Sequence, residues 1–238
     1  VGLRQEHNES VGCIFLEEEN HFTAKCLAGK VLNKRIHLPD VKYTEAEMDK
    51  AFDILSEDKL ALYDSKGERS WECVKETIRH MVVGWGCKWI CLDHITALVH
   101  TDPRATTDKV IAQYVSELVA LMGEIQFTTF LTTQLNTPTL PNYMENGKHI
   151  VRPFEAGGVP TLNNLYGSRA LGQWSDFVLT IERDMTDDEI RNLVGIRVLK
   201  DRLSGDSTGK VVNCVYNTNS GRILERMGET FQDVEDLY

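Results

Sequence analysis

Trp89-Ile90-Cys91-Leu92-Asp93-His94 is an apolar run that stops abruptly at an acid. A short apolar run of this kind is typical of a strand buried on both faces, as in the middle of a parallel sheet. An Asp at the carboxyl end of such a strand lies in the crevice where α/β sheets bind ligands, and it can hold the hydration shell of a Mg²⁺ bound to phosphates. Strands also end at an Asp that caps the next helix or turn, so both interpretations of Asp93 stay open on this stretch alone.

Similar strand patterns alternate with helical patterns along the chain. Apolar or β-branched runs occupy residues 11–16, 128–132 and 177–181. The clearest helix covers about residues 108–125, which carry apolar side chains at 3.6-residue spacing, and others start near Thr44 and near Ser70. Strand, helix, strand, helix predicts an α/β fold with a mostly parallel sheet covered on both faces.

The last third of the chain changes character. Closely spaced strands are expected at residues 193–199, 211–216 and 222–224, with a turn at 217–221, as an antiparallel extension of the sheet. Residues 135–166 show no clear periodicity and are broken by Pro and Gly, which predicts a long loop with a function. With no repeat or domain linker, the expectation is one domain over residues 1–238, with an acidic tail over 225–238.

Composition and charge narrow the function classes. The 238 residues carry a formal net charge of −10, so the surface as a whole repels nucleic acid and anionic membranes, and any polyanion contact must be local. The six cysteines lack zinc-ligand spacing and are interpreted as reduced core residues. Without an 18-residue apolar span or a signal peptide, a soluble intracellular protein is expected. The chain begins with Val1 rather than Met, which hints at a missing upstream part.

Two further strand ends carry groups suited to phosphate chemistry. The run at 11–16 ends in Glu17-Glu18-Glu19, and a carboxylate there could deprotonate a water that attacks a γ-phosphate. The run at 128–132 leads to Gln134, which could bind the γ-phosphate. The alternatives are a solvated helix N-terminus for the three Glu residues and an ordinary surface residue for Gln134.

Six stretches, in order and with similar spacing, resemble one family. They are VGCIFLEEE (11–19), GCKWICLDHIT (86–96), FLTTQLN (130–136), LYGSRALGQWSD (165–176), LTIERD (179–184) and RVLKDRLSGDSTG (197–209). The chain resembles the DnaB-type hexameric replicative helicases of the RecA-like ATPase superfamily, and within them the helicase part of phage and mitochondrial primase-helicases. The resemblance implies a RecA-like three-layer sandwich.

The resemblance also implies roles for single residues. Glu17 corresponds to the catalytic base, Asp93 to the Walker-B carboxylate that holds Mg²⁺ through water, and Gln134 to the γ-phosphate sensor, while His94 follows the Asp as in the phage members and counts among the nucleotide-binding residues. In the Lys-x-Arg pattern, Arg202 corresponds to an arginine finger that reaches the ATP of a neighbouring subunit, with Lys200 beside it. Two cations one residue apart on a strand point to the same side, so both could approach one triphosphate.

Further positions match nucleotide- and DNA-contacting residues of the family. Arg183 and Tyr216 match residues that sandwich the nucleotide base of ATP or another NTP, a role that suits both side chains. The DNA-binding candidates, in the loop at 135–166 and the segment after it, are Lys148, Arg152, Gly167, Arg169 and Gln173. Between Leu140 and Gly172, three cations face two acids, in contrast to the acidic whole. Family members commonly have Arg at the position of Tyr166, and several phage members have it at that of Gly172.

A RecA-like ATPase needs a P-loop, G-x-x-x-x-G-K-[ST], and the 238 residues contain none. Residues 205–210 (GDSTGK) are one residue too short between their glycines and are expected to form a turn. The prediction is therefore a part of a replicative helicase motor, inactive as an isolated chain, that couples NTP hydrolysis to translocation on single-stranded DNA.

The expected partners of that motor are DNA, further copies in a hexameric ring, a primase and a separate or upstream P-loop segment. The expected location is cytoplasmic, in the bacterial host if the chain is phage-encoded. Two alternatives are a non-hydrolysing RecA-like scaffold and a RecA-class recombinase. The recombinase is disfavoured by the Lys-x-Arg pattern and by residues 167–173.

Overall fold

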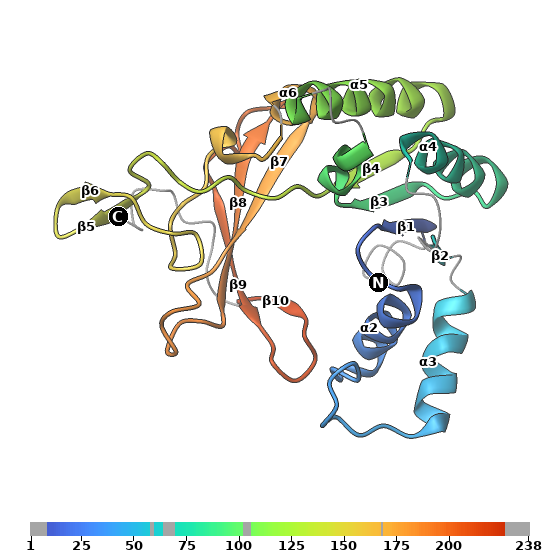
Figure 1. The fold of residues 1–238 in the computed structure, drawn as a ribbon. Coiled ribbons are helices and arrows are strands. Elements are labelled where there is room, and N and C mark those ends of the chain that lie inside the picture. The colour runs from blue at the N-terminus through green and yellow to red at the C-terminus, as the bar shows by residue number, and fades with distance from the viewer. Residues whose placement is uncertain (1–8, 58–59, 64–69, 102–105, 168, 227–238) are drawn as a thin grey trace. The chain divides into compact units, whose positions relative to one another are not determined.

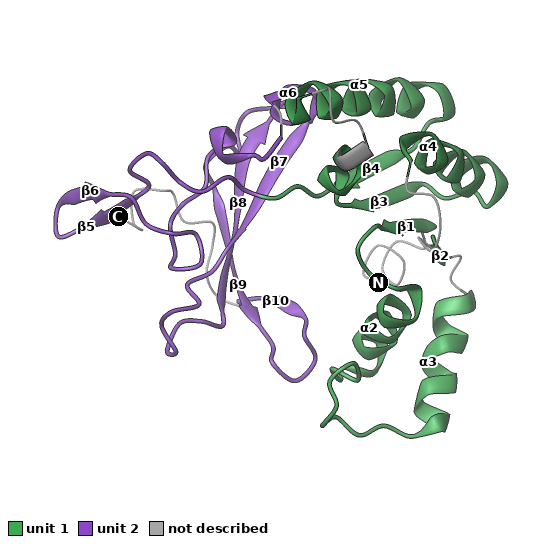
Figure 2. Ribbon diagram, viewed as in Figure 1, with its two compact units in different colours: residues 1–134 green, residues 135–238 purple. Residues whose placement is uncertain are grey.

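The structure is a computed structural model that describes residues 9–57, 60–63, 70–101, 106–167 and 169–226. Most of the expected acidic tail, residues 227–238, lies outside the described residues. The chain divides into two compact units, Val1–Gln134 and Leu135–Tyr238, which Figure 2 shows in green and purple.

The first unit is an α/β structure. Its elements are β1 (Val11–Phe15), α2 (Asn20–Leu32), α3 (Glu45–Glu57), β2 (Leu60–Leu62), α4 (Trp71–Arg79), the π-helix η1 (His80–Gly84), β3 (Trp89–Asp93), the 3-10 helix η2 (Ile95–Thr101), α5 (Thr107–Ile125) and β4 (Thr128–Leu131). The strands form one sheet in the order β2-β1-β3-β4, and every pair in it is parallel. The predicted strands at 11–16, 89–92 and 128–132 are thereby confirmed to within one residue.

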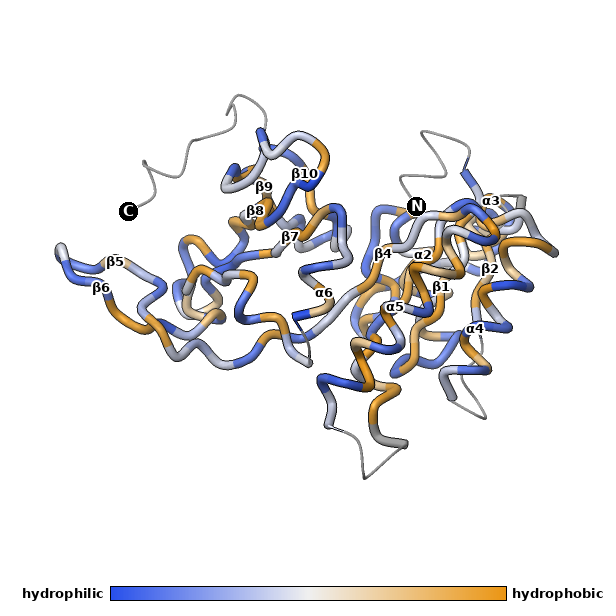
Figure 3. Tube along the Cα trace, turned by 90° about the horizontal axis from the view of Figure 1, so that it is seen from above, coloured by the Kyte–Doolittle hydropathy of each residue, from blue (hydrophilic) through white to orange (hydrophobic). Residues whose placement is uncertain are grey.

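Helices lie on both sides of this sheet, with α4 and α5 on one side and α2 and α3 on the other (Figure 1). The side chains that fill the interior, among them Ile14, Ile90 and Leu92, are fully buried. Figure 3 shows the corresponding hydrophobic segments along β1, α2 and α5. At Gly12, a Cβ atom would lie 2.7 Å from the sulfur of Met81, so the close packing of β1 against η1 depends on a residue without a side chain.

Both of the helices predicted to start near Thr44 and Ser70 begin with side-chain caps. Thr44 and Glu47 form a capping box, in which the Glu47 amide donates to Oγ1 of Thr44 (3.2 Å) and the Thr44 amide donates to Oε2 of Glu47 (2.9 Å). Ser70 accepts a hydrogen bond from the amide of Cys73 at the start of α4 (3.2 Å). None of the described helices has the length and apolar character needed to cross a membrane.

The second unit is built around an antiparallel sheet. Its elements are β5 (Tyr143–Glu145), β6 (Lys148–Ile150), the 3-10 helix η3 (Leu162–Asn164), α6 (Arg169–Trp174), β7 (Phe177–Glu182), β8 (Leu193–Asp201), β9 (Val211–Tyr216) and β10 (Ile223–Glu225). The four last strands pair in the order β10-β9-β8-β7, all antiparallel, as expected for the C-terminal part. Among the described residues they form a sheet of their own, with no hydrogen-bonded ladder to the parallel strands.

The segment 135–166 contains more regular structure than its sequence predicts. β5 and β6 form a hairpin whose two turn residues, Asn146 and Gly147, have φ angles of 49° and 74°. Positive φ at both positions is the geometry that Asn-Gly turns adopt readily. The expectation of a loop without regular structure is therefore wrong for residues 143–150. Residues 205–210, in contrast, form the predicted turn between β8 and β9.

Candidate functional site

The carboxyl edge of the parallel sheet brings together the predicted catalytic residues of the first unit. Glu17 follows the end of β1, Asp93 is the last residue of β3, and Gln134 follows β4. The edge is fixed by backbone hydrogen bonds, since the amide of Leu16 donates to the carbonyl of Asp93 (2.8 Å). Of the three consecutive Glu residues, Glu19 is the N-cap residue of α2, as the alternative interpretation had it, while Glu17 faces the site.

Asp93 ends β3 at the carboxyl edge of the sheet, which is where α/β sheets bind ligands. Its side chain is partly exposed, and its Oδ1 atom accepts a hydrogen bond from the hydroxyl of Thr132, the residue after β4. Mg²⁺ is usually held by one or two carboxylates plus phosphates and keeps several waters, so a single oriented carboxylate fits such an ion. In the described part of the chain, no three His, Cys, Asp or Glu side chains gather to hold a metal ion by themselves.

His94 joins the other members of this edge. Its Nε2 atom lies 3.2 Å from Oε1 of Glu17 and 3.4 Å from Nε2 of Gln134, and its Nδ1 atom lies 2.5 Å from Oγ1 of Thr96. The His94 side chain is only 13% exposed, whereas that of Glu17 is 63% exposed and open to solvent. A ring nitrogen has one N–H or one lone pair, so Nε2 either donates to the Glu17 carboxylate or accepts from the Gln134 amide. Glu17 and Gln134 therefore compete for one histidine atom.

Arg202 lies just after β8 in the second unit, at the start of a hydrogen-bonded turn. Its guanidinium is 59% exposed and lies 3.7 Å from the carboxylate of Asp176. The preceding Asp201 accepts hydrogen bonds from the hydroxyls of Ser204 and Ser207 and from the amides that follow it, and these bonds hold the pKa of its carboxyl far below the usual value. An exposed arginine on a turn fixed in this way suits a finger that reaches another molecule. The role of Asp201 in fixing this turn was not predicted from the sequence, although a run of Asp, Ser and Gly is typical of such turns.

Lys200 does not lie beside Arg202 in the predicted way. β8 ends at Asp201, so the two cations do not share one strand. The ammonium of Lys200 donates to the backbone carbonyls of Gly172 (2.7 Å), Gln173 (3.2 Å) and Ser175 (2.9 Å) at the end of α6. An ammonium has three N–H bonds, and all three are used here. In this arrangement Lys200 has no donor left for a phosphate.

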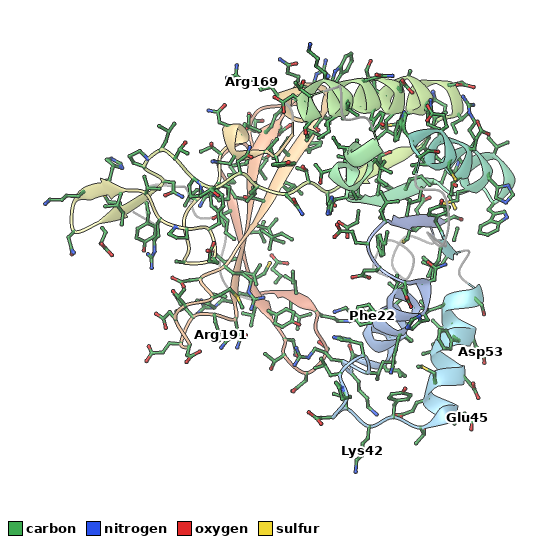
Figure 4. All side chains as sticks on the ribbon, in the orientation of Figure 1. Phe22, Lys42, Glu45, Asp53, Arg169 and Arg191 are labelled. Atoms are coloured by element: carbon green, nitrogen blue, oxygen red, sulfur yellow. The ribbon has the colours of Figure 1, made fainter. Side chains whose placement is uncertain are left out.

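Arg183 and Tyr216 lie side by side, but the two side chains contact each other directly. The guanidinium carbon lies 4.8 Å from the centre of the Tyr216 ring. The guanidinium also donates to the carbonyl of Arg191 (2.6 and 3.1 Å) in the β7–β8 loop, where Figure 4 labels Arg191. A base between two stacked groups needs them roughly 7 Å apart, twice the usual contact distance. The arrangement thus leaves no room for a base between these side chains, and their sandwich role stays a prediction that requires Arg183 to move. A cavity of about 400 Å³ opens beside Arg183, with Glu182, Asn213 and Arg226 among its lining residues.

The five DNA-binding candidates differ in their surroundings. Lys148, Arg169 and Gln173 are exposed, and Figure 4 labels Arg169 at the start of α6. Gly167 is buried and has a φ of 97°, which favours glycine. Arg152 is held within the unit, because its guanidinium pairs with Asp184 (3.2 Å) and stacks on the ring of Tyr143 (4.1 Å). The surroundings of Arg152 therefore favour a structural role.

Comparisons with known proteins find similarity to helicases. The chain is 31% identical over 218 residues to the "DNA helicase/primase" of Enterobacteria phage T3; the match covers 89% of the chain and 36% of the phage protein. No protein-family model matches. One solved structure, described as an ATPase domain, matches with a TM-score of 0.70 at 16% sequence identity. The match covers 93% of this chain and 76% of the chain in that structure. A second solved structure, of a DnaB-like replicative helicase and its interactions with primase, matches with a TM-score of 0.70 at 17% sequence identity. The match covers 92% of this chain and 52% of the chain in that structure.

The parallel sheet and the antiparallel C-terminal sheet, matched by these solved structures, define a RecA-like fold. Within that class, the chain is similar to DnaB-type helicases and corresponds to part of a phage helicase/primase. The expected family and fold class are thereby confirmed. The chain spans about a third of the length of the phage protein, so the activity of a whole helicase is a separate question.

Proposed function

We propose that the chain is the part of a replicative helicase motor that activates the attacking water, senses the γ-phosphate and supplies an arginine finger in trans. The observation that carries the proposal is the meeting of Glu17, Asp93 and Gln134 around His94 at one sheet edge. The intact motor would hydrolyse ATP or another NTP between subunits and move along single-stranded DNA. A P-loop, absent from these 238 residues, would come from a further segment.

In the first unit, Glu17 takes the proton of the water that attacks the γ-phosphate. Its exposed carboxylate is free to meet that water, and His94 orients it through the 3.2 Å contact. Gln134 donates to a γ-phosphate oxygen when the triphosphate is present and turns back to His94 when the phosphate has left. Asp93, held by Thr132, orients the hydration shell of Mg²⁺, which when bound neutralises phosphate charge.

In the second unit, Arg202 stabilises the charge that develops on the γ-phosphate of a neighbouring subunit. A finger acting in trans requires an oligomer, for which a hexameric ring in the host cytoplasm is the form proposed. Arg169, Gln173 and Lys148 contact single-stranded DNA, with exposed side chains as the supporting observation. A primase is the proposed further partner, because the chain resembles part of a helicase/primase.

The test joins a phage-type P-loop segment ahead of Val1 and compares NTP hydrolysis by purified variants. Arg202→Ala is expected to lower turnover about 10³-fold or more with nearly unchanged nucleotide affinity, because the finger acts on the transition state. Glu17→Gln should lower turnover about 10²- to 10⁴-fold through loss of the base. Glu19→Gln is the matched control, since its carboxylate pairs only with exposed His21 among the described residues, and it should keep turnover within twofold.

Three outcomes would contradict the proposal or part of it. Ring formation without hydrolysis in the P-loop form would favour the scaffold, and strand exchange without unwinding would favour the recombinase. Equal turnover of Glu17→Gln and Glu19→Gln would remove the base assignment.

A further inference from the structure

Two cysteines lie side by side on the central strands of the first unit. Cys13 on β1 and Cys91 on β3 are directly paired in the register of these parallel strands. Paired residues of neighbouring strands lie on the same face of the sheet, and the strands are about 4.8 Å apart. The two thiols hydrogen bond with each other, and all six cysteines are free. The pair therefore already brings its sulfur atoms into contact.

The spacing of this pair suits a disulfide bond. A disulfide joins cysteines whose Cα atoms are about 4.4–6.8 Å apart, and the distance between neighbouring strands lies within that range. Its Cβ atoms lie about 3.8 Å apart, so the bond would draw β1 and β3 together locally. A disulfide under such tension is easily reduced, which favours a reversible site over a permanent cross-link.

Cys91 is the member of the pair that a small oxidant can reach. Cys13 is only 6% exposed, whereas Cys91 is partly exposed. On its other side, Cys91 is paired in register with Phe130 of β4, whose side chain is 47% exposed. An oxidant can therefore react with Cys91 first, while Cys13 is held next to it as the thiol that resolves the product.

Cys26 offers a comparison within the same unit. It is also partly exposed, but it lies on α2, where no cysteine stands three or four residues away. Side chains three and four residues apart are the neighbours along a helix surface. Exposure of the thiol is thus shared by Cys26 and Cys91, and the cysteine in direct register is what distinguishes Cys91.

We propose that Cys13 and Cys91 form a reversible redox site that a peroxide oxidises to a disulfide. With hydrogen peroxide, the Cys91 sulfur attacks one oxygen, the O–O bond breaks, and Cys91 becomes a sulfenic acid as one water leaves. The Cys13 sulfur then attacks the Cys91 sulfur, the S–O bond breaks, and the hydroxyl leaves as a second water with the Cys13 proton. The two sulfur atoms supply the two electrons that reduce the peroxide.

The disulfide would join the two strands that carry proposed catalytic groups. Two residues beyond the cysteines, Phe15 is paired in register with Asp93, and Glu17 follows Phe15 by two residues. Drawing the strands together at Cys13 displaces this edge of the sheet, so oxidation should lower NTP turnover. This consequence rests on the proposed function, whereas the redox site itself rests on the strand register and the contact of the two thiols.

The first measurement uses the 238-residue chain and needs no nucleotide. The reduced protein is treated with hydrogen peroxide in native buffer, the remaining thiols are alkylated, and unreduced peptides are analysed by mass spectrometry. Peptides joined through Cys13 and Cys91 should appear and should be lost after treatment with dithiothreitol, while Cys26 forms no disulfide. Oxidation of Cys91 without a link to Cys13, or a link from Cys13 to Cys87 instead, would overturn the proposal.

Three serine variants assign the two roles. Cys13→Ser should leave Cys91 as a sulfenic acid that dimedone traps, because the resolving thiol is gone. Cys91→Ser should leave Cys13 an unmodified thiol at the same dose of peroxide, and it decides the question if Cys13→Ser does not fold. Cys26→Ser is the matched control and should form the same disulfide as the wild type. Oxidation of Cys13 in Cys91→Ser as fast as in the wild type would contradict the assigned order.

The second measurement uses the form that carries a P-loop. Peroxide should lower the turnover of the wild type about tenfold, since small displacements of catalytic groups are costly, and dithiothreitol should restore it. Cys91→Ser should keep its turnover in peroxide. A disulfide that leaves turnover unchanged would overturn the regulatory consequence. If the reduced wild type hydrolysed no NTP, the proposed function would fail, while mass spectrometry would still decide whether the redox site exists.

Discussion

The two units of the chain are stabilised by different means. Of the twelve largest fully buried side chains among the described residues, ten lie in the first unit and only Val194 and Val211 lie in the second. At the centre of the second unit, Arg197 is 5% exposed and donates to both oxygens of Glu182 (2.6 and 3.0 Å). Meanwhile Phe177, Leu179 and Ile181 of β7 are each about half exposed or more. The fully buried apolar side chains are thus concentrated in the first unit, while the second unit has a buried ion pair at its centre.

This difference fits the division of proposed tasks. A sheet edge that must hold Glu17, Asp93 and Gln134 in fixed positions gains from a close-packed apolar frame, which leaves little room for local motion. A unit that carries a finger and DNA contacts is instead connected through directional bonds such as those of Lys200 and Asp201. Directional bonds can exchange partners during a cycle, whereas a packed core cannot do so without leaving cavities. The comparison predicts that mutations in the two units differ in kind.

The largest stability effect is expected for Arg197→Met. The substitution keeps the apolar stem but leaves the Glu182 carboxylate, 15% exposed, without its cationic partner and with the Thr180 hydroxyl (3.1 Å) as a neutral one, at a cost of about 4 kcal/mol in the free energy of unfolding. Urea unfolding with hydrogen exchange should place the loss in residues 135–226. The double variant Arg197→Met/Glu182→Met should recover most of it, because an apolar pair no longer contains an unpaired charge. A double variant as unstable as the single one would contradict this explanation.

Leu92→Ala tests the apolar frame of the first unit. Leu92 is fully buried in β3, so the truncation leaves a cavity and should lower the free energy of unfolding by about 3 kcal/mol. The control is Leu140→Ala in the second unit, where the same atoms are removed from a side chain that is 69% exposed. The loss in Leu92→Ala should be confined to the first unit and be insensitive to salt. A loss equal in the two variants would show that the packing around β3 is loose.

How much of this could be predicted from the sequence depends on the range of the interaction. β1 and β3 were predictable because a parallel sheet buried on both faces requires continuous apolar runs, as at 11–15 and 89–92, whereas the three-residue strand β2 was not predicted. The hairpin β5–β6 was not predicted, because apolar and polar residues do not alternate cleanly in the short segments around Asn146-Gly147. That dipeptide is nevertheless a strong turn signal.

The candidate site divides in the same way. Glu17, Asp93 and Gln134 could be placed at one edge because each follows a strand of one parallel sheet. The partners of Lys200, Arg152 and Arg183 could not be predicted, because a charged residue in a sequence carries no record of which distant carbonyl, carboxylate or ring it will meet. Those contacts depend on tertiary packing across tens of residues, as between Lys200 and Gly172.

Glu117 provides a polar connection within the first unit, and its titration should be measurable. It accepts hydrogen bonds from Lys75 (2.6 Å) on α4 and from Gln113 and Trp71, and these bonds lower its pKa to about 2. Because the folded pKa lies below the unfolded value, the stabilisation is complete above about pH 4.5 and is lost as the pH falls toward 2.

The effect is about 1–2 kcal/mol, since solvent screens a side chain that is 32% exposed. Wild type should therefore lose that much more stability than Glu117→Gln between pH 5 and pH 2.5, as measured by urea unfolding at each pH. If the free energy of unfolding of the two proteins changed equally with pH, the predicted contribution of Glu117 would be wrong.

The smallest effect is expected at the cap of α3. Thr44→Ala removes the oxygen that accepts the Glu47 amide, which should cost about 1 kcal/mol. α3 packs with α2 in a small cluster around Ala28, Ile36 and Leu55, apart from the β3 core, so the loss should appear as faster exchange of α2 and α3 alone. Thr44→Ser, which keeps the oxygen, is the control. If Thr44→Ala instead raised exchange equally in β1 and β3, the first unit would open as one cooperative body, and its difference from the bonded second unit would be sharper still.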